Sequence, residues 1–266
     1  MKILKTGQFY GHTNEIQTLG SLTLTDTEYT QEKVDWHYHE NAYFTFLIDG
    51  MVVEGNKKEI YHCPAGTLLF HHWQEPHYNI KPKGFTRGFH VELKPEWFLD
   101  FELEIGNLQG STNLYNPQLK ALMYNIFKES KQNNGSLAID SLLIELFSKA
   151  GKNEDQLSRK IPDWVPKIRS VLHDDLSYEW SLHKLSKQLD IHPVHLSRDF
   201  QKYFGCNIGM YIRTIRVQRS LAMIAKGSTS LTSIALDCGF ADQSHFIRSF
   251  KSLHKITPLA YRKLLF

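Results

Sequence analysis

The chain has 266 residues, which is enough for two domains, and its 41% hydrophobic and 22% charged residues are ordinary for a globular protein. Its three cysteines are scattered and odd in number, which argues against a disulfide framework or a zinc finger: Cys63, Cys206 and Cys238. The first residues contain no apolar stretch of signal-peptide length, and no later run approaches about 18 apolar residues. We therefore expect a cytoplasmic chain without a membrane span.

Residues from about 20 to 93 predict a series of short strands. The apolar run 43–48 reaches a turn at Asp49-Gly50 and continues into Met51-Val52-Val53. Further turn signals follow at Gly55-Asn56, Pro64-Ala65-Gly66 and Lys83-Gly84. Many short strands separated by turns are typical of a sandwich or a small barrel.

Histidines recur in this strand region at a fixed spacing. His37, His39 and Tyr43 precede Gly50 as H-x-H-x3-Y-x6-G, and His77 lies eleven residues after Gly66. This pattern resembles the two sequence motifs of the cupin barrel. Tyr43 stands where metal-binding cupins place Glu, and His72 and Gln74 replace the usual Pro and Gly of the second motif.

Strand alternation allows His37 and His39 to point into the barrel together, where His77 could join them. A polar pocket for an organic effector, with histidines as hydrogen-bond partners, is one interpretation. A bound metal ion is a second, since imidazoles suit zinc, copper, iron or nickel. Structural packing is a third. We expect His37, His39, Tyr43 and His77 to bind an effector, and we expect no cofactor.

Aromatic residues crowd nearby at Trp36, His71, His72 and Trp73. They would suit stacking on a sugar or an aromatic metabolite, and equally an ordinary barrel core. On the last predicted strand, Arg87 and His90 differ by three positions, so at most one of them points inward.

Helices are predicted after the strands. Pro95 suits the first position of a helix. Apolar stripes at helical spacing then predict an antiparallel pair over 117–131 and 137–150. The polar run Gly151 to Lys160 is typical of a linker, and Trp164 opens the next helix. We predict an N-terminal domain over 1–150, a linker over 151–160 and a C-terminal domain over 161–266.

The last stretch of the chain repeats one helix-turn-helix pattern. Ser186 and Ala235 are small residues 49 positions apart, whereas Arg198 and Arg248 are 50 apart, so the second turn is one residue longer. Gly239 is free to take positive φ in that turn. Each second helix has one apolar face and an opposite polar, basic face that can meet a partner. The apolar positions are Leu196, Phe200 and Phe204 in one copy and Phe246, Phe250 and Leu253 in the other.

The charge distribution indicates which partner this is. From Ser181 onward, 13 Lys and Arg stand against 4 Asp and Glu, whereas the preceding residues hold 18 against 24. A basic tail of net +9 is thus joined to an acidic body of net −6. Such a tail favours a polyanion, because Lys and Arg that neutralise phosphates release counterions.

The tail resembles the DNA-binding domain of AraC-type transcription regulators, in which one long helix joins two helix-turn-helix units. The joining helix would be 210–225. Further matches are Gly239-Phe240, Phe246-x-Arg248-x-Phe250-Lys251 and Thr257-Pro258-x-x-Tyr261-Arg262. The chain departs from the pattern where Ile208 replaces Pro, Ser220 replaces Ala and Lys255 replaces a helix-ending Gly. Lys at a left-handed cap would cost on the order of 1 kcal/mol.

The resemblance implies base contacts from both second helices. They would be made by Val194, Ser197 and Arg198 in the first copy and by Gln243, Ser244 and Arg248 in the second. His195 and His245 could contact DNA or a neighbouring helix. Two such helices would enter major-groove segments roughly 34 Å apart.

The resemblance also implies an α+β fold with two domains, a cupin-like barrel with a helical hairpin followed by an all-α tandem helix-turn-helix domain. The expected function is sequence-specific transcription regulation in response to a small-molecule effector. Partners would be promoter DNA, RNA polymerase and a second subunit, with the 117–150 hairpin either forming the dimer contact or packing on its own barrel. A metal-dependent cupin enzyme with a DNA-binding tail and a constitutive DNA binder with a purely structural barrel are the alternatives.

Overall fold

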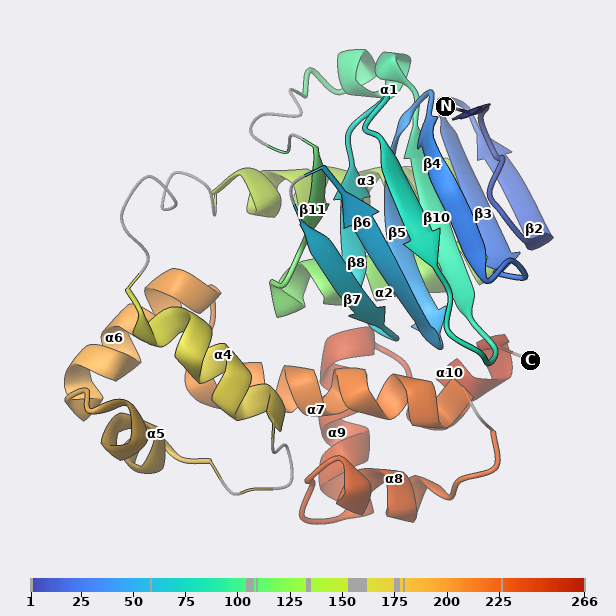
Figure 1. Ribbon diagram of the computed structural model, residues 1–266. Coiled ribbons are helices and arrows are strands. Elements are labelled where there is room, and N and C mark those ends of the chain that lie inside the picture. The colour runs from blue at the N-terminus through green and yellow to red at the C-terminus, as the bar shows by residue number, and fades with distance from the viewer. Residues whose placement is uncertain are drawn as a thin grey trace. The chain divides into compact units, whose positions relative to one another are not determined.

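A computed structural model describes residues 2–57, 59–103, 108, 110–132, 135–152, 162–174, 178, 180–225 and 227–265. The chain divides into two compact units, one formed by residues 1–115 and 122–151 and the other by residues 116–121 and 152–266 (Figure 1). Most of the predicted linker lies outside the described residues. Among the described helices, none combines the length and the apolar character needed to cross a membrane.

The first unit is built from two β-sheets. One has five strands in the order β1-β4-β9-β6-β7, and the other has six in the order β11-β8-β5-β10-β3-β2. The strands are β1 Lys2–Leu4, β2 His12–Leu19, β3 Leu22–Glu28, β4 Lys33–His39, β5 Ala42–Asp49, β6 Met51–Asn56, β7 Ile60–Pro64, β8 Leu68–His71, β9 His77–Ile80, β10 Arg87–Leu93 and β11 Ser111–Asn113. Three helices belong to this unit wholly or in large part, α1 Pro95–Asp100, α2 Pro117–Gln132 and α3 Ser136–Lys152. The series of strands, the Pro95 start and the helical pair are thus confirmed.

The strand β5 is buried on both faces because each face meets a different partner. Phe44 and Phe46 pack on the helices, with ring centroids 5.4 Å from Phe147 of α3 and 4.3 Å from Tyr124 of α2. Their alternating neighbour Tyr43 faces the space between the sheets. The apolar stripes of α2 and α3 therefore cover the six-stranded sheet of their own barrel, as one of the two interpretations expected.

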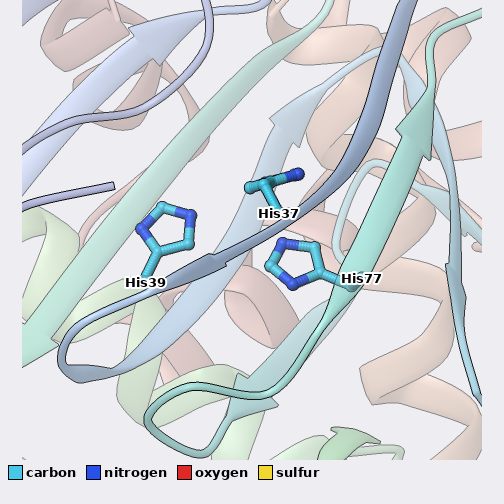
Figure 2. A group of neighbouring side chains, drawn as sticks. All are labelled: His37, His39 and His77. Atoms are coloured by element: carbon cyan, nitrogen blue, oxygen red, sulfur yellow. The ribbon is translucent and has the colours of Figure 1, made fainter. Parts of the chain in front are cut away.

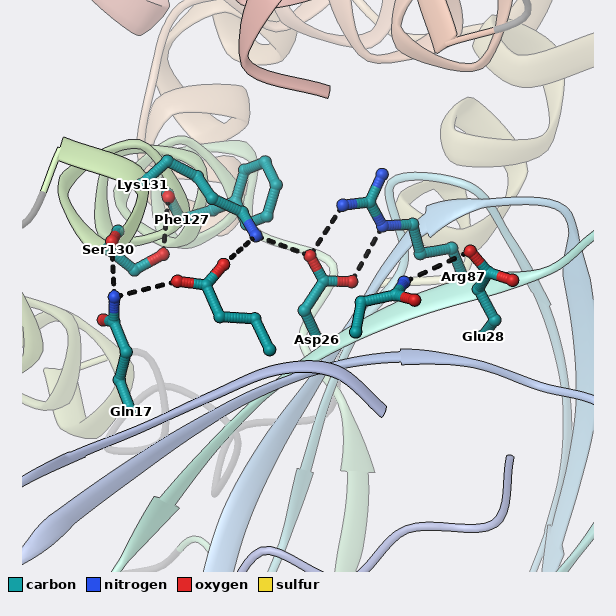
Figure 3. A network of polar contacts seen from close by, with 9 residues as sticks. Gln17, Asp26, Glu28, Arg87, Phe127, Ser130 and Lys131 are labelled. Carbon is teal, nitrogen blue, oxygen red and sulfur yellow. Dashed lines mark hydrogen bonds and ion pairs between the residues drawn. The ribbon is translucent and has the colours of Figure 1, made fainter. Parts of the chain in front are cut away.

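An ion-pair network also fastens α2 to this sheet (Figure 3). Asp26 of β3 accepts hydrogen bonds from Arg87 and from Lys131 of α2, and Lys131 also donates to Glu15 of β2. Gln17 donates to the backbone carbonyl of Ser130. The helix is thus held by charge as well as by its apolar face.

The turn signals of the strand region are borne out in part. Asp49-Gly50 joins β5 of the six-stranded sheet to β6 of the five-stranded one. Gly50 is confirmed as a turn residue, with φ +77°. Gly55 was wrongly predicted to punctuate the strands, since it lies within β6. A Cβ there would come within 2.2 Å of the Tyr78 ring, so glycine serves close packing rather than a turn.

The second unit is helical. Its helices are α4 Trp164–Asp174, α5 Leu182–Leu189, α6 Pro193–Phe204, α7 Ile208–Ala225, α8 Leu231–Asp237, α9 Gln243–His254 and α10 Pro258–Leu265. The pair α5 and α6 and the pair α8 and α9 are the predicted helix-turn-helix units, and α7 joins them (Figure 1). From α5 to α8 the first residues are 49 apart and from α6 to α9 they are 50 apart, which confirms the longer second turn.

Local chemistry explains where these helices begin and end. The side chains of Ser181, Ser230 and Asp242 accept hydrogen bonds from the free backbone N–H groups of the following turns. Gly239 has φ +82°, as predicted. Lys255 ends α9 at φ +61°, the left-handed cap at which glycine is usual.

The other two departures from the family pattern are accommodated without strain. Ile208 is the first residue of α7, a position at which proline is optional. Ser220 is fully buried, but its hydroxyl donates a 2.6 Å hydrogen bond to the Val217 carbonyl oxygen. A buried hydroxyl that is paired in this way carries little penalty.

Candidate functional site

The space between the two sheets gathers the expected pocket residues. His37 and His39 from β4 and His77 from β9 belong to the five-stranded sheet, and Tyr43 from β5 belongs to the six-stranded sheet. All four are at most 3% exposed. The imidazole rings of His37 and His77 lie 4.2 Å apart between centroids, and Figure 2 shows the three histidines around one space. The structure therefore brings together all four predicted side chains.

Three further polar side chains complete this cluster and were not assigned to it from the sequence. Glu54 comes from β6, His71 from β8 and His90 from β10. The Nε2 atom of His71 lies 3.5 Å from Glu54 Oε2, and the His90 Nδ1 atom lies 3.1 Å from the Thr45 hydroxyl. Arg87 points to the opposite face, so the expectation that at most one of Arg87 and His90 faces inward is confirmed.

Hydrogen bonds fix the direction of several rings. A backbone carbonyl can only accept, so the contacts of His37 Nδ1 with the Asp35 oxygen (2.9 Å) and of His77 Nδ1 with the Glu75 oxygen (3.1 Å) place a proton on each Nδ1. The Nε2 atom of His77 is then an acceptor. Tyr43 donates its hydroxyl proton to it over 3.0 Å.

The cluster is neutral and poorly paired. Burial lowers the pKa of His77 and of His90 to about 3, and it lowers the pKa values of His37, His39 and His71. Burial raises the pKa of Glu54 to about 8, against which a hydrogen bond from Asn79 acts. Three buried atoms have no hydrogen-bond partner among the described residues, namely His39 Nδ1, Glu54 Oε1 and His71 Nε2.

The cavity at this cluster is small, with a volume of about 30 Å³. Phe9 and Tyr10 line it as well, and the Phe9 ring stacks on His90 with centroids 3.6 Å apart. Trp36 and Trp73 do not line it and are 41% and 39% exposed, so the interpretation that they belong to the barrel core is wrong for these two residues. Gln74, which replaces a motif glycine, adopts φ +60° and keeps the turn that glycine would make.

The second helices of the two helix-turn-helix units expose the predicted basic faces. Val194, Ser197 and Arg198 are exposed on α6, and Ser244 and Arg248 are exposed on α9. The opposite faces are buried, through Leu196, Phe200 and Phe204 on α6 and through Phe246, Ser249, Phe250 and His254 on α9. Leu253, predicted for the second apolar face, is only half-buried.

Arg198 and Arg248 occupy equivalent positions, since each is the sixth residue of its helix. Arg198 forms an ion pair with Asp199 at 3.0 Å. Exposed ion pairs contribute little free energy, so Arg198 can leave Asp199 to bind a ligand at small cost. Gln243 is half-buried, and its side-chain oxygen accepts a hydrogen bond from Thr232. His195 is exposed beside Arg198, whereas His245 is half-buried and packs on Phe240 at 5.4 Å.

The sequence did not single out Arg213 of α7. It lines a cavity of about 260 Å³ between α7 and α9 together with Arg248. The guanidinium groups of Arg213 and Arg248 therefore lie close enough together to contact the same anionic partner. The signal was present as an exposed Arg in the joining helix, but only the packing of α9 on α7 brings the two together.

Two family models match the chain. The model described as an AraC-like ligand binding domain matches residues 19–147, and the model described as a helix-turn-helix domain matches residues 185–264. The chain belongs to the AraC-type family of transcription regulators. Its fold is the family's two-domain fold, with a cupin-like N-terminal domain and a helical DNA-binding domain.

Curated relatives of this AraC-type chain are transcription regulators. The regulator MtrA of Neisseria gonorrhoeae is 28% identical over 134 residues, which cover 47% of this chain and 44% of that protein. The transcriptional activator RhaR of Mannheimia succiniciproducens is 24% identical over 150 residues, which cover 54% of each chain. The chain thus spans about half the length of these relatives. Among solved structures, an apo variant of ToxT from Vibrio cholerae is 16% identical with a TM-score of 0.42, over 94% of this chain and 100% of that one.

The two sites of this AraC-type chain support different chemistry. Neutral imidazoles and a buried carboxyl offer lone pairs to a cation or to a hydrogen-bond donor inside the N-terminal domain. Exposed guanidinium groups on helices offer bidentate donors to phosphates and base edges.

Proposed function

We propose that this AraC-type regulator reads a specific promoter sequence through α6 and α9, and that a small effector in the N-terminal pocket changes how tightly it does so. The observation that carries the first part is the repetition of Arg198 and Arg248 at the same position of two helices whose other faces are buried. Neither arginine is needed for packing, yet both helix-turn-helix units have one at this position. This repetition suits a contact that both units make with the same external partner. Arg is the residue that pairs bidentately with guanine in the major groove.

The proposed base contacts are those expected from the family pattern. They are made by Val194, Ser197 and Arg198 of α6 and by Gln243, Ser244 and Arg248 of α9. Val194, which is 65% exposed, suits contact with a thymine methyl group. The side-chain oxygen of Gln243 is engaged by Thr232, so its amide nitrogen is the group that faces DNA. Arg213 adds a phosphate contact beside Arg248.

The effector is proposed to bind at His37, His39, Tyr43 and His77. Burying unpaired polar atoms costs free energy, and a ligand that pairs them recovers it. The pocket contains such atoms among its described residues, which supports a site built for an occupant rather than for packing alone. An effector can shift DNA affinity only if it binds the two arrangements of the protein with different affinity.

Several further partners are proposed from the family. The regulator acts in the cytoplasm as a homodimer and contacts RNA polymerase at the promoter. The buried stripes of α2 and α3 cover their own barrel, so a dimer contact would use other side chains of this hairpin, of which Leu137 is 81% exposed. The curated relatives are regulators, which supports a regulator rather than a cupin enzyme.

The test begins with selection of a preferred duplex from a random library by the full-length protein. At a fixed salt concentration, the selected duplex should bind at least about 10³-fold more tightly than random DNA of the same length. Equal affinities would refute sequence-specific binding. A DNA affinity that no ligand of the N-terminal domain changes would favour the constitutive binder.

A further inference from the structure

We propose that the effector of the N-terminal domain is a divalent first-row transition-metal ion, held by Glu54, His71 and His77. This inference rests on the proposed effector-binding role of the pocket and names the chemical class of its ligand. The three side chains each offer a ligand atom, and those atoms lie within 4.8 Å of one another. In a tetrahedral site with metal–ligand distances of about 2.0–2.2 Å, neighbouring ligand atoms are roughly 3.4 Å apart. Small rotations of these side chains would close that difference.

Burial and pairing set these residues apart from ordinary core. Glu54 is 2% exposed and His71 is fully buried. Glu54 Oε1 and His71 Nε2 have no hydrogen-bond partner within the part of the chain that the structure describes. The His71–Glu54 approach of 3.5 Å leaves both groups short of a good hydrogen bond. A cation between them would satisfy the oxygen and the nitrogen at once.

The histidines are oriented as metal ligands usually are. The Nδ1 atom of His77 donates to the Glu75 carbonyl oxygen, and the Nδ1 atom of His71 lies 2.9 Å from the Ser111 hydroxyl. Both contacts fix the rings through the nitrogen that faces away from the cluster. Each Nε2 is left to coordinate, which is the arrangement seen around most metal-bound histidines. Binding would displace the Tyr43 hydroxyl from His77 Nε2 and release the proton of Glu54.

The cavity volume selects an ion over an organic molecule. Pockets for organic ligands commonly enclose about 300–1,000 Å³. The cavity that Glu54 and His77 line measures about 30 Å³, which accommodates an ion with a water molecule, and His71 approaches Glu54 from beside it. An organic effector would require the surrounding rings, including Phe9 stacked on His90, to move apart.

The carboxylate decides between two overlapping ligand sets. His77 also forms a group with His37 and His39, whose ligand atoms lie within the same 4.8 Å limit. That group offers no anionic ligand, whereas Glu54 offsets part of the charge of a dication in a buried site. Glu54 and His77 come from one sheet and His71 from the other, so the ion would join the two sheets. His37 and His39 would then line the open side of the ion.

The experiment uses the full-length protein after removal of metals with a chelator. Zn²⁺ and Co²⁺ are added separately, and binding is measured by competition with a chromophoric chelator and by elemental analysis after dialysis. The variants are Glu54→Gln, which keeps the shape of the protonated carboxyl, and His71→Gln. The matched controls are Glu59→Gln and His62→Gln, which alter exposed residues of the same types at the neighbouring β7. Circular dichroism establishes that each variant is folded.

We expect one ion per chain, a visible Co²⁺ spectrum, and affinities at least tenfold weaker in both pocket variants but unchanged in both controls. Metal should also change the affinity for the selected duplex by about fivefold or more. The inference is overturned if the folded wild-type protein binds no ion, if Glu54→Gln binds as the wild type does, or if bound metal leaves DNA affinity unchanged. Failure of the proposed function looks different, because selected and random DNA would then bind equally with or without metal.

Discussion

Asp26 and Arg87 form a two-point ion pair on the helix-facing side of the six-stranded sheet. Arg87 donates from Nε to Oδ1 over 2.8 Å and from Nη2 to Oδ2 over 2.6 Å, while Lys131 of α2 donates to the same Oδ2 over 2.7 Å (Figure 3). The Asp26 side chain is only 3% exposed. One carboxylate thus neutralises two cations at the contact between sheet and helix.

Replacing Asp26 by Asn should lower the free energy of unfolding of the N-terminal domain by roughly 3 kcal/mol. The amide keeps the size of the carboxylate but leaves Arg87 and Lys131 without their shared buried anion. Burial raises the pKa of Asp26, but Arg87 and Lys131 outweigh it and hold that pKa below its ordinary value. The stabilisation is therefore present above the unfolded pKa and is lost as pH falls through the folded pKa.

Urea unfolding of wild type and Asp26→Asn at neutral and at low pH measures this effect. The two proteins should converge in stability as the solution is acidified. Glu145→Gln, which removes an exposed pair with Lys149 on α3, is the control and should change stability by less than about 0.5 kcal/mol. If the difference in unfolding free energy between wild type and Asp26→Asn were the same at both pH values, the stabilisation would not depend on ionisation of Asp26.

Glu92 should give stability the opposite pH dependence to that given by Asp26. It is 1% exposed, and burial raises its pKa to about 7, although a hydrogen bond from the Gly7 backbone N–H lowers it. The folded state therefore keeps its proton while the unfolded state ionises, and stability falls as pH rises from about 4.5 to about 7. Glu92→Gln has no proton to lose. Its stability relative to the wild type should rise by roughly 3 kcal/mol across this window, and a difference independent of pH would contradict the assignment.

The helix-turn-helix domain could be predicted almost completely because its constraints are local and written twice. Small residues at Ser186 and Ala235, apolar residues at helical spacing and the glycine at Gly239 each act within one turn or between adjacent helices. Such local features can be recognised from the spacing of residues in the sequence. The exposure of Arg198 and Arg248 followed from the same periodicity.

The pocket could be predicted only in part. Alternation placed His37 and His39 on one face of β4, and the spacing to His77 supplied the third ring. Glu54 was missed although it shares the inward face of β6 with Val52, since a carboxylate in a strand is ordinarily read as solvent-exposed. The meeting of Glu54 with His71 depends on how two sheets face each other, and that relation is not encoded in the spacing of either strand.

Lys255 ends α9 with a left-handed backbone, which its Cβ disfavours. Replacing it by Gly should raise the free energy of unfolding of the C-terminal domain by up to about 1 kcal/mol, because relief of strain outweighs the greater freedom of glycine in the unfolded chain. Denaturant unfolding monitored by helical circular dichroism measures the change. Lys251→Gly, four residues earlier within α9, should instead destabilise the domain by about 1 kcal/mol. Destabilisation by both substitutions would mean that the cap of α9 is not strained.

Arg248 should matter for which DNA is bound rather than for whether DNA is bound. It is exposed on α9, opposite the buried Phe246 and Phe250, so Arg248→Ala should leave the fold intact. Losing a bidentate contact to one base should weaken binding to the selected duplex by about 1–3 kcal/mol and relax the preference at one base pair. Random DNA should be affected far less.

The measurement is fluorescence anisotropy titration at fixed salt, on the selected duplex, on its single-base variants and on random DNA. Arg219→Ala removes an exposed arginine from α7 and is the control for charge alone. If Arg219 meets only phosphates, its loss weakens specific and random binding by the same factor. If Arg248 reads a base, Arg248→Ala should instead reduce the difference in affinity between the selected duplex and random DNA. An equal loss on both kinds of DNA, as in the control, would assign Arg248 to the phosphate backbone.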